Sequence, residues 1–223
     1  MNKNIVVVAP HPDDETIGIG GTLLKHKAQG DHLYWVLATS MNEHPKFSAE
    51  RVALRGREIA EVARRYGFES VVTLGFQTCM LDTLPLNDII GRISEIFTKL
   101  QPDTIYLPYR GDIHSDHAVV FDAISACTKW FRYPMIKRIL CYETPSETDF
   151  TINPDSHGFR PNVFIDISPY LETKIEIMKL YRGEMGEFPF PRSEQALRAW
   201  AAVRGAAAGF VAAEACMLLK ELI

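Results

Sequence analysis

The chain has 223 residues, of which 47% are hydrophobic and 23% charged, and its formal net charge is −4. This composition is ordinary for a globular protein with one sizeable core. An acidic balance without a block of Lys or Arg argues against nucleic acid or an anionic membrane surface as the main partner. No apolar run approaches the roughly 18–20 residues that a membrane span requires.

The first predicted element is a strand at Ile5–Ala9, a continuous and mostly β-branched run. Such a run is typical of a strand buried on both faces of a parallel sheet. It is only five residues long and meets the segment HPDDE at once, so we interpret it as a strand and not as a signal peptide. Further strands are expected at Leu33–Ala38, Thr104–Leu107, Arg138–Tyr142 and Val163–Ile167.

Segments with helical spacing of apolar residues separate and follow these strands. They are Glu50–Tyr66, which stops at Gly67, Asn87–Leu100, Ala118–Phe131, Tyr170–Met185 and the Ala-rich Arg192–Leu222. Gly205 and Gly209 lie inside the last of these. Each costs about 1 kcal/mol in a helix relative to Ala, which predicts close packing there or approach of the segment to the site. The alternation predicts an α/β fold with a doubly wound, mostly parallel sheet and flanking helices. We expect one domain over residues 1–223.

Four cysteines are spread along the chain without any CxxC pair: Cys79, Cys127, Cys141 and Cys216. Reduced, buried thiols explain this spacing best. The sequence therefore predicts a cytoplasmic protein.

Polar residues are concentrated in two short segments that follow predicted strands. His11, Asp13 and Asp14 come directly after the first strand, and Gly111–His117 follow the strand at Thr104–Leu107. The carboxyl ends of parallel strands form the ligand crevice of an open sheet. We therefore expect the two segments to converge although about 100 residues separate them.

The residue types in these segments suit a catalytic zinc ion, which typically takes three ligands from His, Asp or Glu. His11 and Asp14, with one histidine of the second segment, would supply them. Zinc can lower the pKa of its water to about 7. Hydrolysis of an amide also needs a base for the proton of the water and a donor for the developing charge.

Three further side chains are available for these tasks. Asp13 and His114 lie beside the ligands in sequence, and Asp116 is near enough to orient His114 and raise its pKa by hydrogen bonding.

HPDDE after the first strand, together with HSDH after a later one, resembles the PIG-L/LmbE-like zinc-dependent N-deacetylase family. The resemblance extends over nearly the whole chain, through segments that include Leu74-Gly75-Phe76 and Ala213-Glu214. It implies a Rossmann-like fold, zinc bound by His11, Asp14 and His117, Asp13 as general base, and His114 as the residue that protonates or stabilises the oxyanion. Asp116 would tune His114, and Arg55 would hold the substrate.

Several residues have a simpler structural interpretation beside the functional one. Asp13 and Asp14 suit the start of a helix near Thr16, and Arg55 suits a solvated helix face with an ion pair to Glu58. Asp112 fits either a supporting contact or a turn, and Arg204 either an ion pair toward the active-site carboxylates or an exposed position. Gly18–Gly21 fails the GxGxxG dinucleotide pattern at Leu23, so close packing is expected.

The sequence thus predicts a hydrolase that removes the acetyl group of an N-acetylated amino sugar, whether free, glycosidic or nucleotide-linked, by attack of a zinc-bound water. Fe²⁺ or another divalent ion is compatible with the same ligands. The alternative is an amidase or esterase that uses the same metal site on a different conjugate. We expect a small-molecule partner, no nucleic acid and no membrane span, and the Ala-rich C-terminal segment offers a surface for a homo-oligomer.

Overall fold

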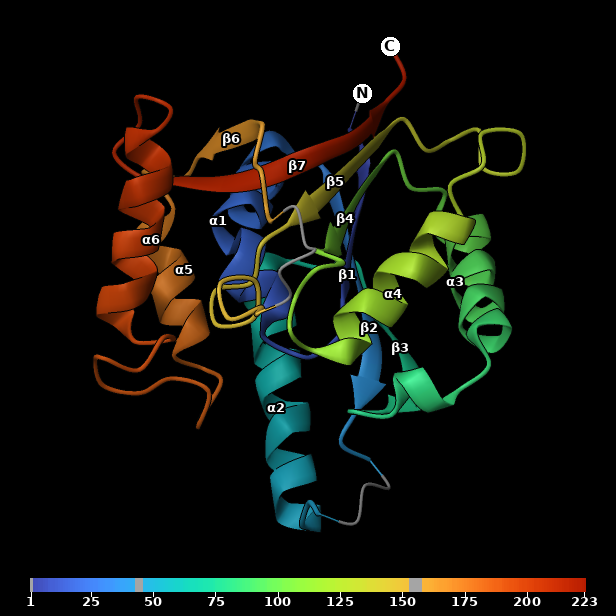
Figure 1. The fold of residues 1–223 in the computed structure, drawn as a ribbon, viewed down its shortest axis with the longest axis horizontal. Coiled ribbons are helices and arrows are strands. Elements are labelled where there is room, and N and C mark those ends of the chain that lie inside the picture. The colour runs from blue at the N-terminus through green and yellow to red at the C-terminus, as the bar shows by residue number, and fades with distance from the viewer. Residues whose placement is uncertain (1, 43–45, 153–157) are drawn as a thin grey trace.

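The structure is a computed structural model that describes residues 2–42, 46–152 and 158–223. Its strands in these ranges are β1 (Asn4–Ala9), β2 (His32–Ser40), β3 (Ser70–Gln77), β4 (Thr104–Pro108), β5 (Arg138–Tyr142), β6 (Val163–Asp166) and β7 (Ala213–Glu221). They form one sheet in the order β3-β2-β1-β4-β5-β7-β6 (Figure 1). The first four neighbouring pairs of this order are parallel, and the two pairs that involve β7 are antiparallel.

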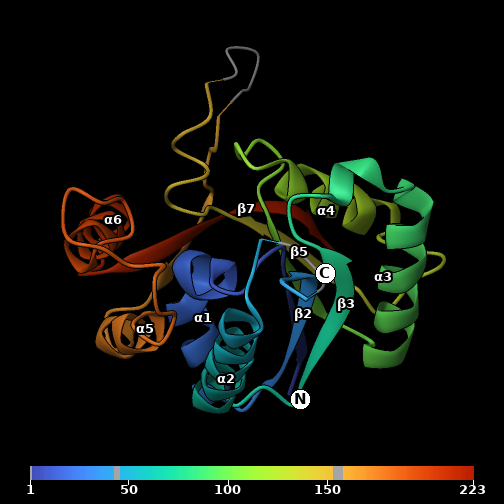
Figure 2. The same cartoon turned by 90° about the horizontal axis from the view of Figure 1, so that it is seen from below.

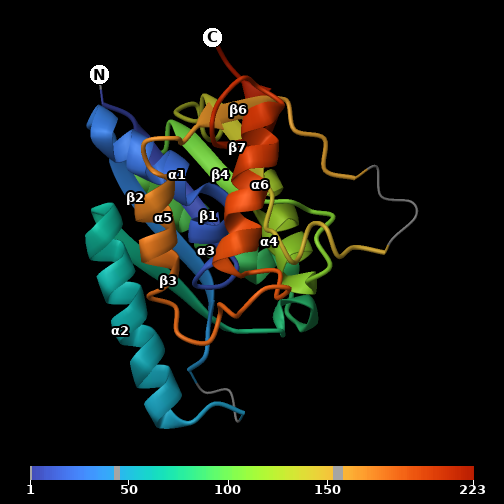
Figure 3. The ribbon, with the colours of Figure 1, turned by 90° about the vertical axis from the view of Figure 1, so that its left-hand side faces the viewer.

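The described helices are α1 (Asp14–Gln29), α2 (Ala49–Tyr66), α3 (Leu86–Leu100), α4 (Ser115–Ala126), α5 (Leu171–Met178) and α6 (Glu194–Ala206), with a 3₁₀ turn at Leu81–Thr83. They cover both faces of the sheet (Figure 2). α1, α2 and α5 lie on one face, α3 and α4 on the other, and α5 contacts both α1 and α6 (Figure 3). None of these helices combines the length and apolarity needed to cross a membrane.

β1 lies inside the sheet, between β2 and β4, and contributes side chains to both cores. Ile5 and Val7 pack into the core under α1, α2 and α5, whereas Val6 and Val8 pack into the core under α3 and α4. All four are fully buried, because successive side chains of a strand point to opposite faces and both faces are covered here. The predicted α/β fold with a mostly parallel sheet and flanking helices is confirmed, and each of the five predicted strands overlaps an observed one. That a single domain spans residues 1–223 stays a prediction.

The prediction of one long helix over Arg192–Leu222 is wrong in its second half. α6 ends at Ala206, and the chain turns back to form β7 between β5 and β6. Gly205 permits this return, since a Cβ there would lie 2.6 Å from the carbonyl oxygen of Phe210. The first half of β7 is buried in the sheet. Its hydrogen bonding to β5 and β6 on both edges outweighs the helix propensity of its alanines.

Other elements also differ from the prediction. The helices predicted at Tyr170–Met185 and Ala118–Phe131 are shorter, ending at Met178 and Ala126. β3 was not predicted, and the segment Leu74-Gly75-Phe76, through which the family resemblance extends, lies inside it. β3 forms one edge of the sheet, is only partly buried and contains Gly75 at φ +77°, so it lacks the alternation that identifies a strand from sequence.

α1 is bent at Ile19, and a buried ion pair spans the bend. The carboxylate of Glu214 in β7 accepts hydrogen bonds from the backbone of Gly21 at 2.8 Å and Thr22 at 2.7 Å. Lys174 of α5 lies 2.7 Å from this carboxylate and donates to the carbonyl of Ile17 at 2.8 Å. The bend frees backbone groups of α1, and these two side chains satisfy them, so the helix that follows the HPDD segment is fixed by β7 and α5.

Lys174→Met is expected to lower the free energy of unfolding by about 3–5 kcal/mol, because the Glu214 carboxylate would stay buried without its cation. Urea unfolding followed by circular dichroism measures this loss. Lys179→Met is the matched control, since Lys179 is exposed and pairs with Glu176 on the surface; its unfolding should stay close to that of the unchanged protein. Equal losses in the two variants would contradict the prediction.

Candidate metal and catalytic site

Two loops meet at the carboxyl edge of the sheet because β1 and β4 are parallel neighbours. Residues 10–13 connect β1 to α1, and residues 109–114 connect β4 to α4. His11 in the first loop contacts Asp116 at the start of α4, 105 positions later in the chain. The predicted convergence of the two polar segments is therefore confirmed.

The Asp14 carboxylate lies between the rings of His11 and His117. Its Oδ2 atom is 3.4 Å from Nδ1 of His11 and 3.4 Å from Nε2 of His117. The potential ligand atoms of these three residues all lie within 4.8 Å of one another. The set is the one that the family resemblance implied for zinc, and two nitrogens and one oxygen are ligands that a divalent transition metal accepts.

The hydrogen bonding of the two rings tests whether this set fits a metal. The far nitrogen of each ring is engaged by a carboxylate, His11 Nε2 by Asp116 at 3.0 Å and His117 Nδ1 by Asp112 at 2.7 Å. His117 Nε2, which faces Asp14, is buried and has no hydrogen-bond partner in the described structure. Carboxylates commonly orient metal-ligating histidines in this way, and an unpaired buried nitrogen is costly unless a ligand completes it. The residues therefore fit a divalent cation.

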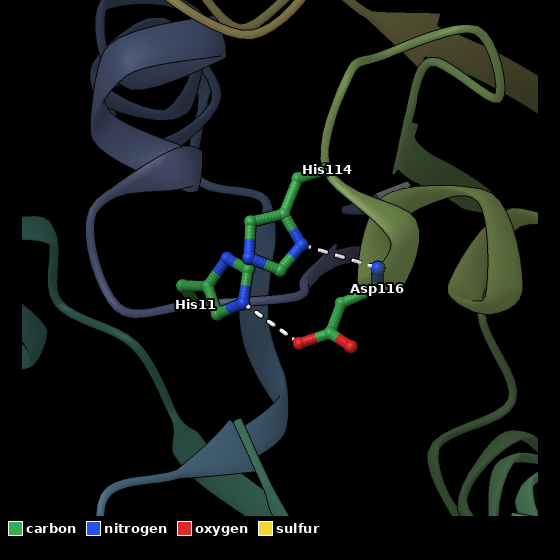
Figure 4. Close-up of side chains that lie close together, drawn as sticks. All are labelled: His11, His114 and Asp116. Carbon is green, nitrogen blue, oxygen red and sulfur yellow. Dashed lines mark hydrogen bonds and ion pairs between the residues drawn. The ribbon is translucent and has the colours of Figure 1, made fainter. Parts of the chain in front are cut away.

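A second possible ligand set comprises His11, His114 and Asp116 (Figure 4). The Asp116 carboxylate and Nδ1 of His114 in this set already have partners within the protein. The Asp116 carboxylate accepts hydrogen bonds from the backbone of Cys79 at 2.8 Å and Leu81 at 3.2 Å, and Nδ1 of His114 accepts from the backbone N–H of Asp116 at 3.1 Å. Among the described residues, the unpaired buried ring nitrogen belongs only to the set with His117. We therefore favour His11, Asp14 and His117.

The two histidines of the favoured set lie in an excess of negative charge. Burial lowers the pKa of His11, but hydrogen bonds with Asp116 and Asp14 outweigh it and raise the value to about 9. Burial likewise lowers the pKa of His117, but the charge of Asp14 and the bond with Asp112 raise it to about 10. A pocket that would hold protons this strongly has surplus negative charge for a cation to neutralise.

The predicted relation between Asp116 and His114 is wrong in its geometry. The Asp116 carboxylate contacts His11, and only its backbone N–H reaches His114. Burial, followed by the charge of His11, lowers the pKa of His114 to about 4 and does not raise it. Since Nδ1 accepts a hydrogen bond, the neutral ring carries its proton on Nε2, and that nitrogen lies 3.6 Å from Sγ of Cys79 in the pocket.

Asp13 has a strained backbone with φ 141° and ψ −28°. Such a conformation costs of order 1–3 kcal/mol for a residue with a side chain, and local hydrogen bonds maintain it. The Asp13 N–H donates to Glu15 at 3.1 Å, and its carbonyl accepts from Thr16 and Ile17. Glu15 is fully buried and also accepts from the hydroxyl of Tyr181 at 2.6 Å. Glu15, in the first turn of α1, thus supports the backbone of the candidate base Asp13.

Arg192 contacts the candidate base Asp13, a contact that the sequence did not predict. Its Nη1 lies 2.8 Å from the Asp13 carboxylate, its Nη2 is 3.1 Å from Glu147, and its Nε donates to Ser146 at 2.7 Å. Burial, followed by the charge of Asp14, raises the pKa of Asp13 well above its usual range, and Arg192 opposes this shift. Arg192 follows Asp13 by 179 positions and belongs to no local motif, so only the fold identifies it.

Arg55 is buried in the described structure, which excludes the solvated helix face considered from the sequence. Its guanidinium donates to the carbonyl of Pro12 at 3.0 Å, lies 3.2 Å from Glu58 and forms an ion pair with Glu184. Glu184 also lies 3.6 Å from Arg192. Arg55 therefore holds the loop that precedes Asp13. Its predicted contact with substrate stays a prediction.

A pocket of about 220 Å³ opens over these residues. Its wall includes His11, Asp13, Asp14, Arg55, Cys79, His114, Glu147, Glu184 and Arg192. Asp112 and Asp116 lie outside this wall and support the rings of His117 and His11. Of the two roles that the sequence left open for Asp112, the structure therefore shows the supporting contact. Arg204 forms two hydrogen bonds with the Glu143 carboxylate, of 2.7 and 2.5 Å. Its ion pair is therefore with Glu143 and not with the carboxylates of the candidate metal site.

The chain is similar to known deacetylases in sequence and in fold. The PIG-L family model, described as GlcNAc-PI de-N-acetylase, matches residues 6–128. Diacetylchitobiose deacetylase of Thermococcus kodakarensis is 28% identical, covering 95% of this chain and 81% of its own length. The structure of N,N'-diacetylchitobiose deacetylase from Pyrococcus horikoshii is similar with a TM-score of 0.77 at 22% identity, over 97% of this chain and 83% of that one.

One further structure shows that the fold alone does not select the reaction. The 4-carboxy-2-hydroxymuconate hydratase of Pseudomonas putida has a TM-score of 0.75 at 17% identity and covers 100% of this chain and 98% of its own. A fold hosts different chemistries, so the reaction has to be argued from the site.

Asp112→Ala is expected to weaken metal binding about 10- to 100-fold, because loss of the carboxylate frees the ring of His117 to reorient. Competition of the purified protein with a metal-chelating dye measures the affinity. Asp122→Ala is the control, since Asp122 lies on the exposed side of α4 and pairs with Arg110. Unchanged affinity in Asp112→Ala would show that the Asp112–His117 contact does not serve the metal.

Proposed function

The chain belongs to the PIG-L family, whose model matches more than half of it, and we propose that it is a metal-dependent N-deacetylase acting on an acetamido sugar. The observation that supports this most directly is the group of His11, Asp14 and His117 with its unpaired nitrogen, because His11 and Asp14 line one pocket together with Asp13. Relatives whose names specify deacetylation of diacetylchitobiose support the choice of substrate.

His11, Asp14 and His117 would hold the cation, with Zn²⁺ as the first choice and Fe²⁺ or another divalent ion compatible with the same ligands. When bound, the cation would act there as a Lewis acid that polarises the acetamide carbonyl and makes water more acidic. Asp112 and Asp116 keep the two imidazole rings in the required tautomers.

Asp13 is the base in this proposal. It takes a proton from the attacking water as the water oxygen bonds to the acetamide carbon, and it returns that proton to the nitrogen as the carbon–nitrogen bond breaks. Acetate and a free amine are the products. Burial raises the pKa of Asp13, which brings its proton affinity closer to the working range of a general base.

His114 is the hydrogen-bond donor to the oxyanion in this proposal. Its Nδ1 is occupied by the Asp116 N–H, so the neutral ring presents Nε2–H to the pocket. A donor that is fixed before the reaction stabilises the developing negative charge without reorganisation. The sequence offered protonation or stabilisation of the oxyanion, and the lowered pKa of His114 favours stabilisation.

The decisive test is acetate release from a panel of N-acetylated sugars, stopped by a chelator and restored by Zn²⁺. Asp13→Asn is expected to bind metal normally and to lose about 10²- to 10⁴-fold in kcat, and asparagine tolerates a positive φ better than most residues. His117→Ala is expected to lose metal and activity together. Full activity of Asp13→Asn would exclude Asp13 as the base, and metal-loaded protein without acetate release from any sugar would exclude the proposed reaction.

His114→Ala is expected to lower kcat about 10²- to 10³-fold, the usual cost of removing one oxyanion donor. Metal content should be unchanged. Because the pKa of His114 is lowered to about 4, its ring is neutral throughout the range above pH 5, so the shape of the pH–rate profile there should be the same in the variant. If one limb of the pH–rate profile disappeared in His114→Ala, this result would instead assign a proton-transfer role to His114.

A further inference from the structure

The wall of the candidate catalytic pocket contains more carboxylates than guanidinium groups. Two guanidinium groups face four carboxylates among its described residues. The guanidinium groups belong to Arg55 and Arg192, and the carboxylates to Asp13, Asp14, Glu147 and Glu184. The carboxylates exceed the arginines by two charges, which is the charge that one divalent cation supplies.

Both arginines of the wall are already committed to partners within the protein. Arg192 contacts Asp13, Glu147 and Glu184. Arg55 forms ion pairs with Glu184 and Glu58, donates to the carbonyl of Pro12, and lies over the ring of Tyr181. A planar guanidinium recognises phosphate through the same donors that it gives to carboxylates. Recognition of an anionic substrate by either arginine would therefore break existing pairs and leave Glu147 or Glu184 facing the incoming negative charge.

The rest of the described pocket wall includes the hydroxyl residues Thr39, Ser40 and Thr78, the apolar residues Pro12, Met41 and Phe47, and Cys79, besides His11 and His114. Hydroxyl and apolar side chains together suit a polar but uncharged ligand. The volume of about 220 Å³ is below the range of about 300–1,000 Å³ that encloses larger ligands. One sugar ring with its acetamide group matches this size better than a sugar nucleotide.

From this balance, and resting on the proposed function, we infer that the pocket selects an uncharged acetamido sugar and rejects the same sugar when it carries a phosphate or a nucleotide. With the cation bound, the wall is electrically balanced and an uncharged substrate leaves it so. A phosphate would add negative charge beside Glu147 and Glu184, while both arginines of the described wall are already paired. Like charges placed side by side disfavour binding and so discriminate against the phosphorylated sugar.

The test compares matched pairs, N-acetylglucosamine, N-acetylgalactosamine and N-acetylmannosamine, each with its 1-phosphate. Binding to the full chain is measured by calorimetry, with Zn²⁺ and again after chelation, and acetate release is measured in parallel. The neutral member is expected to bind at least about tenfold more tightly, which corresponds to only about 1.4 kcal/mol. The preference should shrink as ionic strength rises, because salt screens the repulsion.

Glu147→Gln provides the specific variant, since it removes one wall charge and leaves the metal ligands and Asp13 in place. It is expected to reduce the preference for the neutral sugar several-fold. Glu61→Gln is the matched control, because Glu61 is exposed on α2 and pairs with Arg64; it should keep the full preference.

The outcomes separate this inference from the proposed reaction. Binding of a phosphorylated sugar as tightly as its neutral partner, or failure of every neutral sugar to bind, would overturn the inference. An unchanged preference in Glu147→Gln would overturn the assignment of the selectivity to the wall charges. A neutral sugar that binds preferentially to metal-loaded protein but releases no acetate would instead overturn the proposed reaction and support the charge selection.

Discussion

The position of the Asp14 carboxylate between the rings of His11 and His117 is the contact on which the rest of the site depends. It requires β1 and β4 to be neighbours, because each strand delivers one loop to the same edge of the sheet. It also requires both rings to turn their free nitrogens inward. Asp112 in the second loop and Asp116 at the start of α4 ensure this orientation. The neighbouring strands, the orientation of the rings and the proposed binding of a cation are thus linked through this one contact.

Local sequence was sufficient for the parts of this arrangement that depend on short-range chemistry. The buried run Ile5–Ala9 predicted a central strand, and the polar residues directly after two parallel strands predicted a shared site. The group of His11, Asp14 and His117 lies together as the family resemblance implied. In each case, the information is contained in a strand and the few residues that follow it.

The parts that sequence did not predict depend on distant partners or on the backbone. Arg192 reaches Asp13 from 179 positions away, and β7 is a strand because β5 and β6 accept it on both edges, although its alanines favour a helix. The nearness of Asp116 to His114 in sequence suggested a contact between side chains. The backbone N–H of Asp116 makes that contact instead, and the carboxylate turns to His11.

The use of Glu214 from β7 to fix the bent helix α1 has a consequence for synthesis of the protein. Glu214 follows the glycine that it binds by 193 residues, and Lys174 and Arg192 also come late in the chain. When the HPDD segment leaves the ribosome during synthesis, the residues that fix its conformation have therefore not yet been added to the chain. Under the proposed function, metal binding at full affinity would therefore follow completion of the polypeptide. A chain truncated before β7 would retain His11, Asp14 and His117 but lack the Glu214 contacts that fix α1.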